Sequence, residues 1–213
     1  MNPLLTEVKQ LLQDAAYPWA VCGGFGLDLF LNEEIRTHGD LDICVFEENR
    51  QEILRHMLER DWKVYEFRGM GKVRPMQDAQ SSEPGRNLLC LKEGCELIRF
   101  YPCDERDQYH RFFHTGIREL NYVEFLFNRA EKGEFLFDSG KGIRRKLTEA
   151  IRYRDGIPYL APEIVLLYKA SSAQDGKNHS DFERVYPRMD QDQQNWLLES
   201  LKALYPQGHP WIP

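Results

Sequence analysis

The stretch Arg36-Thr37-His38-Gly39-Asp40-Leu41-Asp42-Ile43-Cys44-Val45-Phe46 places two aspartates, two positions apart, at the start of an apolar run. Residues i and i+2 of a β-strand point to the same face. We therefore expect Asp40 and Asp42 to project side by side, while Leu41 and the alternate apolar residues after it enter the core. Two carboxylates this close repel each other unless a cation lies between them. The pair is a natural site for Mg²⁺, which prefers oxygen ligands and phosphate-bearing substrates.

A glycine-rich segment lies upstream of the aspartates. Residues 19–22 are predicted to form a short buried strand, Gly23-Gly24-Phe25-Gly26 a turn, and residues 27–31 the start of a helix. A glycine-rich turn that enters a helix presents backbone N–H groups to an anion. An anion site and a cation site on neighbouring elements suit a metal-bound nucleoside triphosphate.

A dinucleotide-binding motif is the alternative interpretation of these glycines. Gly24-x-Gly26-x-x-Leu29 follows part of that pattern, but it has leucine where the third glycine belongs. The acids also begin the second strand, whereas the ribose-binding acid of such folds ends it. Both differences favour the triphosphate interpretation.

The order of these motifs resembles the DNA polymerase β-like nucleotidyltransferase superfamily. The likeness is strongest to the branch that holds the aminoglycoside and lincosamide nucleotidyltransferases. It covers residues 17–103, and residues 160–170 with Asp181-Phe182 after them resemble the C-terminal helical part of the same branch. The superfamily usually has Gly-Ser where this chain has Gly23-Gly24, so one hydroxyl group for the triphosphate is missing here.

The resemblance implies an α+β (mixed α/β) fold. Its nucleotidyltransferase-type core would be a mixed β-sheet flanked by helices, and a C-terminal helical region would follow. The expected domains are residues 1–160 for the core and 161–213 for the helical region packed on it.

A third acid is implied for the metal site. Two divalent ions about 4 Å apart bind the attacking and leaving oxygens in phosphoryl chemistry. Glu96 is the candidate, because residues 96–100 are the next apolar strand that carries an acid. The catalytic and metal-binding residues would then be Asp40, Asp42 and Glu96. Alternatives are a solvent-facing Glu96 in a hairpin, with Asp104 or Glu105 as the third acid.

Nucleotide binding is expected from five residues: Gly23, Gly24, Arg36, His38 and Lys169. The glycines would cradle the β- and γ-phosphates. Arg36 and His38 flank the acids, and the resemblance implies that they orient the loop or contact phosphate, although a salt bridge from Arg36 to a nearby acid such as Glu33 is equally consistent with the sequence. Lys169 lies in an apolar helix and either points towards phosphate or extends to solvent.

Composition limits the functional classes. The net charge of −6 argues against broad nucleic-acid binding, which uses a basic surface. No apolar stretch approaches the ~20 residues of a membrane helix, and residues 1–16 are predicted to form an amphipathic helix and not a signal peptide. The five cysteines form no CxxC pair, which favours free thiols and a cytoplasmic protein.

Periodicity and turn residues predict the remaining elements. Asp155-Gly156 is a strong hairpin signal, and Glu93-Gly94 suggests another hairpin, between residues 87–92 and 95–101. The segment 69–86 is expected to be a mobile loop. Further predicted elements are helices over 48–60, from Pro162 to 173 and over 191–205, and strands over 62–67, 122–127 and 134–137.

One other metal pattern exists. His110 and His114 have the spacing of helical zinc ligands, but no third ligand is evident nearby. A partly buried aromatic segment is the alternative interpretation, and we favour it.

The predicted function is transfer of a nucleoside monophosphate, AMP from ATP with two Mg²⁺ ions, onto a hydroxyl group of a small molecule. An aminoglycoside-like antibiotic is one candidate acceptor. Acids of the C-terminal region would suit a cationic acceptor or would only keep a helical surface soluble: Glu163, Asp175, Asp181 and Glu183. Two alternatives stay open, namely transfer to protein or tRNA and a non-catalytic nucleotide-binding protein of the same fold.

Overall fold

The computed structural model describes residues 2–104, 106–113, 117, 119–137 and 140–212. Contacts between Cα atoms divide the chain into two compact units: unit 1 comprises residues 1–19 and 37–127, and unit 2 comprises residues 20–36 and 128–213. This division differs from the one expected at residue 160. Residues 20–36 and 128–160 belong with the C-terminal helices because, for example, strand β1 (Ala20–Val21) pairs with β12 (Ile157–Leu160) in unit 2.

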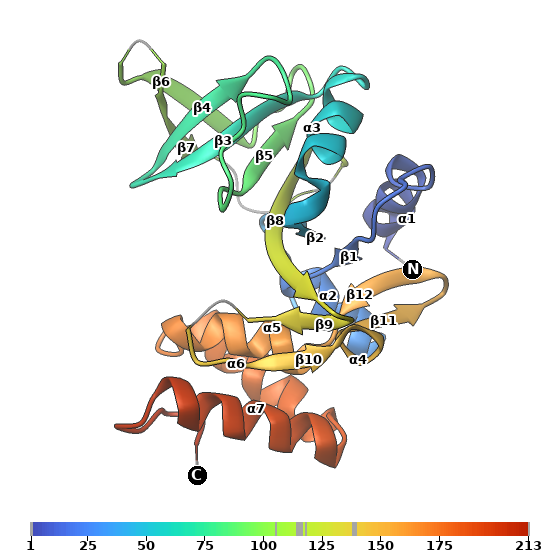
Figure 1. The fold of residues 1–213 in the computed structure, drawn as a ribbon, viewed down its shortest axis with the longest axis vertical. Coiled ribbons are helices and arrows are strands. Elements are labelled where there is room, and N and C mark those ends of the chain that lie inside the picture. Colours follow the sequence, from blue (N-terminus) through green and yellow to red (C-terminus); the bar gives the residue numbers. More distant parts are fainter. Residues whose placement is uncertain (1, 105, 114–116, 118, 138–139, 213) are drawn as a thin grey trace. The chain divides into compact units, whose positions relative to one another are not determined.

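Unit 1 is built on an antiparallel sheet with helices α1 (Pro3–Leu11) and α3 (Arg50–Leu58), the second of which packs on β3 (Figure 1). The strand order is β2-β8-β5-β3-β4-β7-β6. Each neighbouring pair of strands from β8 to β6 is antiparallel. The strands are β2 (Asp42–Phe46), β3 (Lys63–Gly69), β4 (Lys72–Met76), β5 (Leu88–Leu91), β6 (Ile98–Pro102), β7 (Gln108–Phe112) and β8 (Tyr122–Glu131), whose last residues belong to unit 2.

Strand β2 has the alternation that the sequence predicts. Leu41, Ile43 and Val45 are all fully buried. Cys44 and Phe46 are buried as well, so both faces of β2 are covered beyond its first residue. Burial raises the pKa of the Cys44 thiol to about 12, which leaves this cysteine as a neutral core residue.

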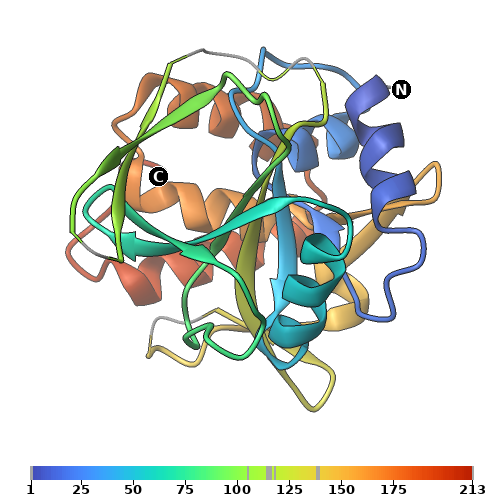
Figure 2. The ribbon, with the colours of Figure 1, turned by 90° about the horizontal axis from the view of Figure 1, so that it is seen from above.

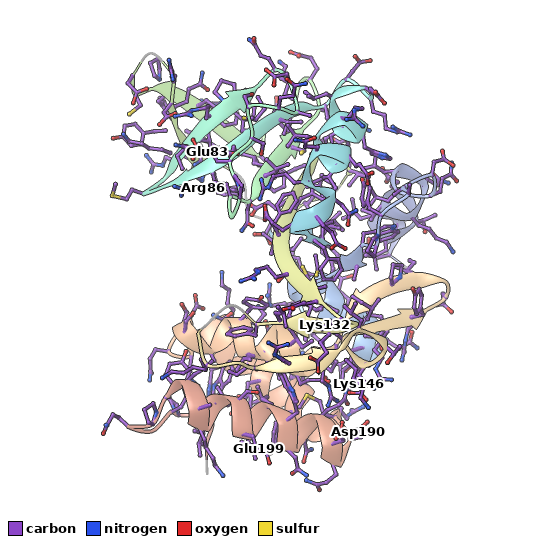
Figure 3. The ribbon with its side chains drawn as sticks, viewed as in Figure 1. Glu83, Arg86, Lys132, Lys146, Asp190 and Glu199 are labelled. Carbon is purple, nitrogen blue, oxygen red and sulfur yellow. The ribbon has the colours of Figure 1, made fainter. Side chains whose placement is uncertain are left out.

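The segment 69–86, expected to be a mobile loop, contains strand β4 and is anchored after it. Glu66 is fully buried on β3, and it accepts hydrogen bonds from Ser82 Oγ at 2.9 Å and from the backbone N–H of Glu83 at 2.7 Å. Arg50 donates to the backbone carbonyl of Arg86 at 2.6 Å. Figure 3 labels Glu83 and Arg86, which lie beside the strands of unit 1. A buried carboxylate therefore orders a segment whose composition suggested a flexible loop.

The hairpin expected across Glu93-Gly94 is wrong. Strand β5 pairs with β3 and β8, whereas β6 pairs with β7 at the far end of the sheet. The turn exists, and Gly94 has a φ of +76°. It connects strands that do not pair, because β8 and β3 occupy both edges of β5.

Unit 2 combines helices with two small groups of strands. Its helix α5 packs against α7, α6 and α2, and in Figure 2 the orange α5 runs beside the red α7. The α-helices of unit 2 are α2 (Gly23–Leu31), α4 (Leu147–Ala150), α5 (Pro162–Lys169), α6 (Gly176–Val185) and α7 (Gln191–Leu204). Unit 2 also has two short 3₁₀ helices, η2 (Ala170–Ser172) and η3 (Tyr186–Arg188). A further 3₁₀ helix, η1 (Glu47–Asn49), belongs to unit 1.

The strands of unit 2 confirm the second predicted hairpin. Strands β11 (Ile151–Arg154) and β12 are antiparallel, and Asp155 and Gly156 between them both have positive φ, at 51° and 73°. That geometry is the two-residue turn that Asp-Gly favours. Strands β9 (Glu134–Leu136) and β10 (Arg144–Lys146) extend the last part of β8. None of the described helices is long and apolar enough to cross a membrane.

Candidate active site

The two aspartates of the central motif lie where β2 begins. Asp42 is the first residue of β2 and is partly buried, and Asp40 is exposed just before it. The residue between them ties this corner to the neighbouring strand, because the backbone N–H of Glu124 on β8 donates to the Leu41 carbonyl at 2.9 Å. The two carboxylates are therefore held at the edge of a rigid central strand pair.

Glu124 adds a carboxyl group that sequence reasoning missed. Its side chain accepts a hydrogen bond from the hydroxyl of Tyr122, two residues earlier on the same face of β8. Burial, helped by the negative charge of Asp40, raises the pKa of Glu124 to about 7 against the opposing hydrogen bond from Tyr122. Burial also raises the pKa of Tyr122, with Glu124, Asp40 and Asp42 adding to the effect. These four side chains thus influence one another electrostatically.

The donor set suits a magnesium ion that is completed by its substrate. Among the described residues, no three His, Cys, Asp or Glu side chains gather closely enough to hold a metal ion by themselves. Mg²⁺ commonly binds one or two protein carboxylates, water and substrate phosphates, and rarely a dedicated protein cage. Asp40 and Asp42 supply hard oxygen ligands of this kind, so the residues fit the ion.

Glu96, the third acid expected from the sequence, does not gather with Asp40 and Asp42 into a metal-binding group of three among the described residues. It is exposed and precedes β6, whereas Asp42 begins β2 at the opposite end of the strand order of unit 1. Asp104 follows β6 at that same far end, and its carboxylate accepts from the N–H groups of Arg106 and Asp107 in a turn. Glu105 lies outside the described residues. The described acid nearest in the fold to Asp40 and Asp42 on a neighbouring strand is Glu124.

The glycines lie in unit 2, in the first turn of helix α2 and not in a turn before it. Gly23 has a φ of +58°, a conformation that favours glycine. Gly26 packs so tightly that an added Cβ would come within 3.0 Å of the Val21 carbonyl oxygen. The helix starts without a side-chain cap at Cys22, so its first N–H groups carry the partial positive charge of a helix N-terminus.

Arg36 and Lys169, also in unit 2, share one buried carboxylate. Asp181 on α6 is 1% exposed, and it contacts Arg36 Nε at 3.1 Å and Lys169 Nζ at 3.0 Å. Burial alone would raise the pKa of Asp181, but the hydrogen bond from Arg36 and the charge of Lys169 lower it overall. The expected partner of Arg36, an acid close in sequence, is therefore replaced by one that is 145 positions away.

The side chain of Lys169 was expected either to point towards phosphate or to extend to solvent, and the structure shows an intermediate position. Its side chain is 15% exposed, and its ammonium group also donates to Asn178 Oδ1 at 3.3 Å. Asp181 thus contacts two cations at once. His38, in unit 1, is buried, and its backbone carbonyl accepts from the N–H of Ile117 at 3.0 Å.

The acids considered for a cationic acceptor are engaged within unit 2. Glu163 is fully buried against Arg145 at 3.1 Å, and Asp181 balances Arg36 and Lys169. Asp175 caps helix α6 by accepting from the N–H of Lys177, and exposed Glu183 lies 3.5 Å from His179. Two of the four carboxylates are thus internal counter-ions.

The alternative of a zinc site required His110 to lie on a helix, and it does not. His110 lies on strand β7, where residues four apart do not share a helix face, and His114 lies outside the described residues. The partly buried aromatic segment is what the structure shows, since the His110 ring contacts Phe67 and Phe112.

Fold and carboxylate positions together define the class: this is a protein with the nucleotidyltransferase fold. Residues 4–81 match the aminoglycoside-2''-adenylyltransferase family, a span that includes Gly23, Gly24 and both aspartates. No curated protein matches the chain in sequence.

Solved structures support the same class through the fold. The lincosamide antibiotic adenylyltransferase LnuA, bound to lincomycin, is 13% identical over 87% of this chain and 96% of its own, with a TM-score of 0.52. The antibiotic-resistance factor ANT(2'')-Ia in solution is 11% identical over 97% of this chain and 96% of its own, with a TM-score of 0.57. ANT(2'')-Ia in complex with adenylyl-2''-tobramycin is 10% identical over 94% and 98%, with a TM-score of 0.56. The resemblance seen in the motifs, to the aminoglycoside and lincosamide branch, is confirmed.

Proposed function

We propose that this protein is a metal-dependent nucleotidyltransferase that moves a nucleoside monophosphate, AMP from ATP, onto a hydroxyl group of a small molecule. The observation that carries the proposal is that the two aspartates at the start of β2 lie beside Glu124 on the neighbouring strand β8. Asp40 and Asp42 flank Leu41, and the Leu41 carbonyl is bonded to the backbone of Glu124.

Asp40 and Asp42 would hold the metal. When bound, Mg²⁺ supplies charge neutralisation at the phosphates, which is the main requirement of phosphoryl-transfer catalysis. The two carboxylates are held by a buried strand and would orient the ion without rearranging. Asn in either position would keep the shape and lose the charge that the ion requires.

Glu124 would receive the proton of the acceptor. The acceptor hydroxyl oxygen forms a bond to the α-phosphorus, the bond from that phosphorus to the pyrophosphate oxygen breaks, and pyrophosphate leaves. The hydroxyl proton passes to a carboxylate oxygen of Glu124. A carboxyl group with a pKa of about 7 is suited to general-base work at neutral pH, and the Tyr122 hydroxyl fixes its orientation.

The nucleotide-binding role proposed for unit 2 rests on its positive groups. The N-terminus of α2 at Gly23 and Gly24 would bind phosphate through backbone N–H groups. Arg36 and Lys169, which both contact Asp181, would add positive charge. His38 stays a prediction as a nucleotide contact.

The proposal of a small acceptor comes from the relatives. LnuA is a lincosamide adenylyltransferase, and the ANT(2'')-Ia complex holds an adenylylated tobramycin. We extend acceptors of that size to this chain. All five cysteines are free thiols, which supports a reducing compartment such as the cytoplasm.

The test is transfer of label from α-labelled ATP with Mg²⁺ to tobramycin, lincomycin, tRNA and extracted protein. We expect pyrophosphate release and an adenylylated small molecule, identified by mass spectrometry. Glu124→Gln and Glu96→Gln form a matched pair: the first should abolish transfer while calorimetric ATP binding persists, and the second should leave both unchanged. Label only in tRNA or protein would instead favour a macromolecular acceptor, and loss of activity in Glu96→Gln alone would remove Glu124 from its role.

A further inference from the structure

One face of the unit 1 sheet carries a row of aromatic rings that leads to Glu124. The registers place Tyr65 and Phe67 of β3 on the same face as Tyr122 and Glu124 of β8, by way of Leu89 and Leu91 on β5. They also place His110 and Phe112 of β7, with Phe100 of β6, on that face. The six aromatic side chains, hereafter the aromatic face, are Tyr65, Phe67, Phe100, His110, Phe112 and Tyr122.

Ring contacts show that the sheet curls towards this face. Tyr65 and Phe100 stack with centroids 4.2 Å apart, although β4 and β7 lie between their strands. Phe112 of β7 meets Tyr122 of β8 edge to face at 5.6 Å, although three strands separate them in the sheet. The curved course of the green strands is visible in Figure 2. The far edge of the sheet is thereby brought back to the residue that contacts Glu124.

The aromatic face is not a closed core. Tyr122 is fully buried, but Phe112 beside it is 42% exposed, and the other four rings are only partly buried. An exposed aromatic ring next to a proposed catalytic carboxyl group offers a ligand a stacking surface. The position of Phe112 is therefore where a bound acceptor would meet apolar surface.

The aromatic face carries few charges on the strands that these registers join. Glu124 is the carboxylate that the registers place on it, and Lys63 of β3 lies on the same face. Burial lowers the pKa of His110, so its imidazole is neutral at pH 7. Its Nδ1 atom is buried with no hydrogen-bond partner among the described residues.

We infer that the aromatic face is the acceptor platform and that it selects a small molecule with an apolar ring or hydrocarbon part beside its reactive hydroxyl. The molecule would be neutral or carry a single positive charge, in contrast to a polyamine-like aminoglycoside. Stacking on Phe112 would place the hydroxyl at Glu124. The inference rests on the proposed function, because that function makes Glu124 the base.

A matched pair of variants tests the platform. Phe112→Ala removes a ring of the aromatic face. Phe113→Ala removes the next ring along the chain, which is 43% exposed, lies on the opposite face and contacts Arg99. The probes are lincomycin, with one basic amine and hydrocarbon substituents, and tobramycin, a polycation. Binding is followed by the aromatic NMR signals of the labelled full chain up to millimolar concentration.

We expect lincomycin to shift the Phe112 and His110 signals and to bind about tenfold more weakly to Phe112→Ala. Phe113→Ala should bind like the wild type, and both variants should bind Mg²⁺–ATP normally. No shift with lincomycin, equal binding by Phe112→Ala, or tighter binding of tobramycin would each overturn the platform. Absence of AMP transfer with lincomycin binding intact would instead count against the proposed function, so the two failures are distinguishable.

Discussion

Glu124 of unit 1 and Asp181 of unit 2 are carboxyl groups removed from solvent, and their surroundings shift their pKa values in opposite directions. Glu124 has a tyrosine hydroxyl and further acids around it, so burial and the charge of Asp40 raise its pKa to about 7. Asp181 is more deeply buried, but Arg36 and Lys169 contact it and lower its pKa. A buried acid without a cation is a candidate for proton transfer, whereas one between two cations is a structural counter-ion.

The difference extends to the composition of the two units. Unit 1 places two aspartates, Asp40 and Asp42, at the start of β2. Unit 2 holds two cations on one aspartate and an uncapped helix N-terminus. The residues proposed to hold the metal thus belong to unit 1, and those proposed to bind phosphate through positive groups belong to unit 2.

The largest expected effect is in unit 1. Asp40→Asn and Asp42→Asn should each lower kcat by about a thousandfold or more, since each removes a charge that the metal requires. Folding should persist, and the Tm of the metal-free protein should stay equal or rise because the repulsion is relieved. Pyrophosphate release measures the activity. Asp61→Asn, in an exposed turn of the same unit with a φ of +60°, serves as control. Undiminished turnover in either active-site variant would falsify the metal assignment.

In unit 2 the expected effect is on stability. Asp181→Ala leaves Arg36 and Lys169 without their shared counter-ion and should cost about 3 kcal/mol of unfolding free energy. Glu183→Ala, on the same helix, removes an exposed acid and should cost at most about 1 kcal/mol. Urea unfolding at neutral pH compares them. Equal stability of the two variants would mean that Asp181 is not an internal counter-ion and could again be considered for ligand binding.

The dependence of stability on pH should separate the two carboxyl groups. The folded pKa of Glu124 is raised, so its contribution is present at low pH and is lost as the pH rises through about 7. The folded pKa of Asp181 is lowered, so its contribution is present at neutral pH and is lost as the pH falls below about 4. In the presence of a chelator, Glu124→Gln should gain on the wild type in Tm as the pH rises. Asp181→Asn should recover towards the wild type as the pH falls.

These two trends are read from Tm differences between each variant and the wild type over the same buffers. A Glu124→Gln difference that stays constant from acid to alkaline pH would show that Glu124 has an ordinary pKa in the folded chain. The same flat result for Asp181→Asn would show that the two cations do not stabilise its charge.

Local patterns in the sequence predicted what local physics decides. The apolar alternation after Asp42 predicted β2, Asp155-Gly156 predicted the hairpin of β11 and β12, and Pro162 predicted the start of α5. In each case a few neighbouring residues restrict the backbone to one conformation. The motif spacing likewise identified Asp40 and Asp42 as a pair at the start of a buried strand.

Long-range pairing was the limit of that reasoning. Glu96 was chosen because it lies on the next acid-bearing apolar strand along the chain, but strand order and not sequence order determines which acid is near β2. Tyr122-x-Glu124 in an apolar strand was a usable signal, since one glutamate on an otherwise buried strand requires a reason. No local signal pointed to the pairing of Asp181 with Arg36, which spans 145 positions.

The smallest effect is expected at Gly24, where the superfamily that the motifs resemble usually has serine. Gly24 is the second residue of α2 and has no positive φ, so serine fits its backbone and would supply the hydroxyl group expected beside the triphosphate. Gly24→Ser should bind Mg²⁺–ATP about threefold to tenfold more tightly, the value of one added hydrogen bond. Gly23→Ser is the matched control, because its φ of +58° disfavours a side chain and should cost about 1 kcal/mol of stability. Calorimetric titration of both variants measures the affinity.

Weaker binding by Gly24→Ser than by the wild type would show that this helix N-terminus does not face phosphate. The nucleotide-binding role of unit 2 would then rest on Arg36 and Lys169 alone.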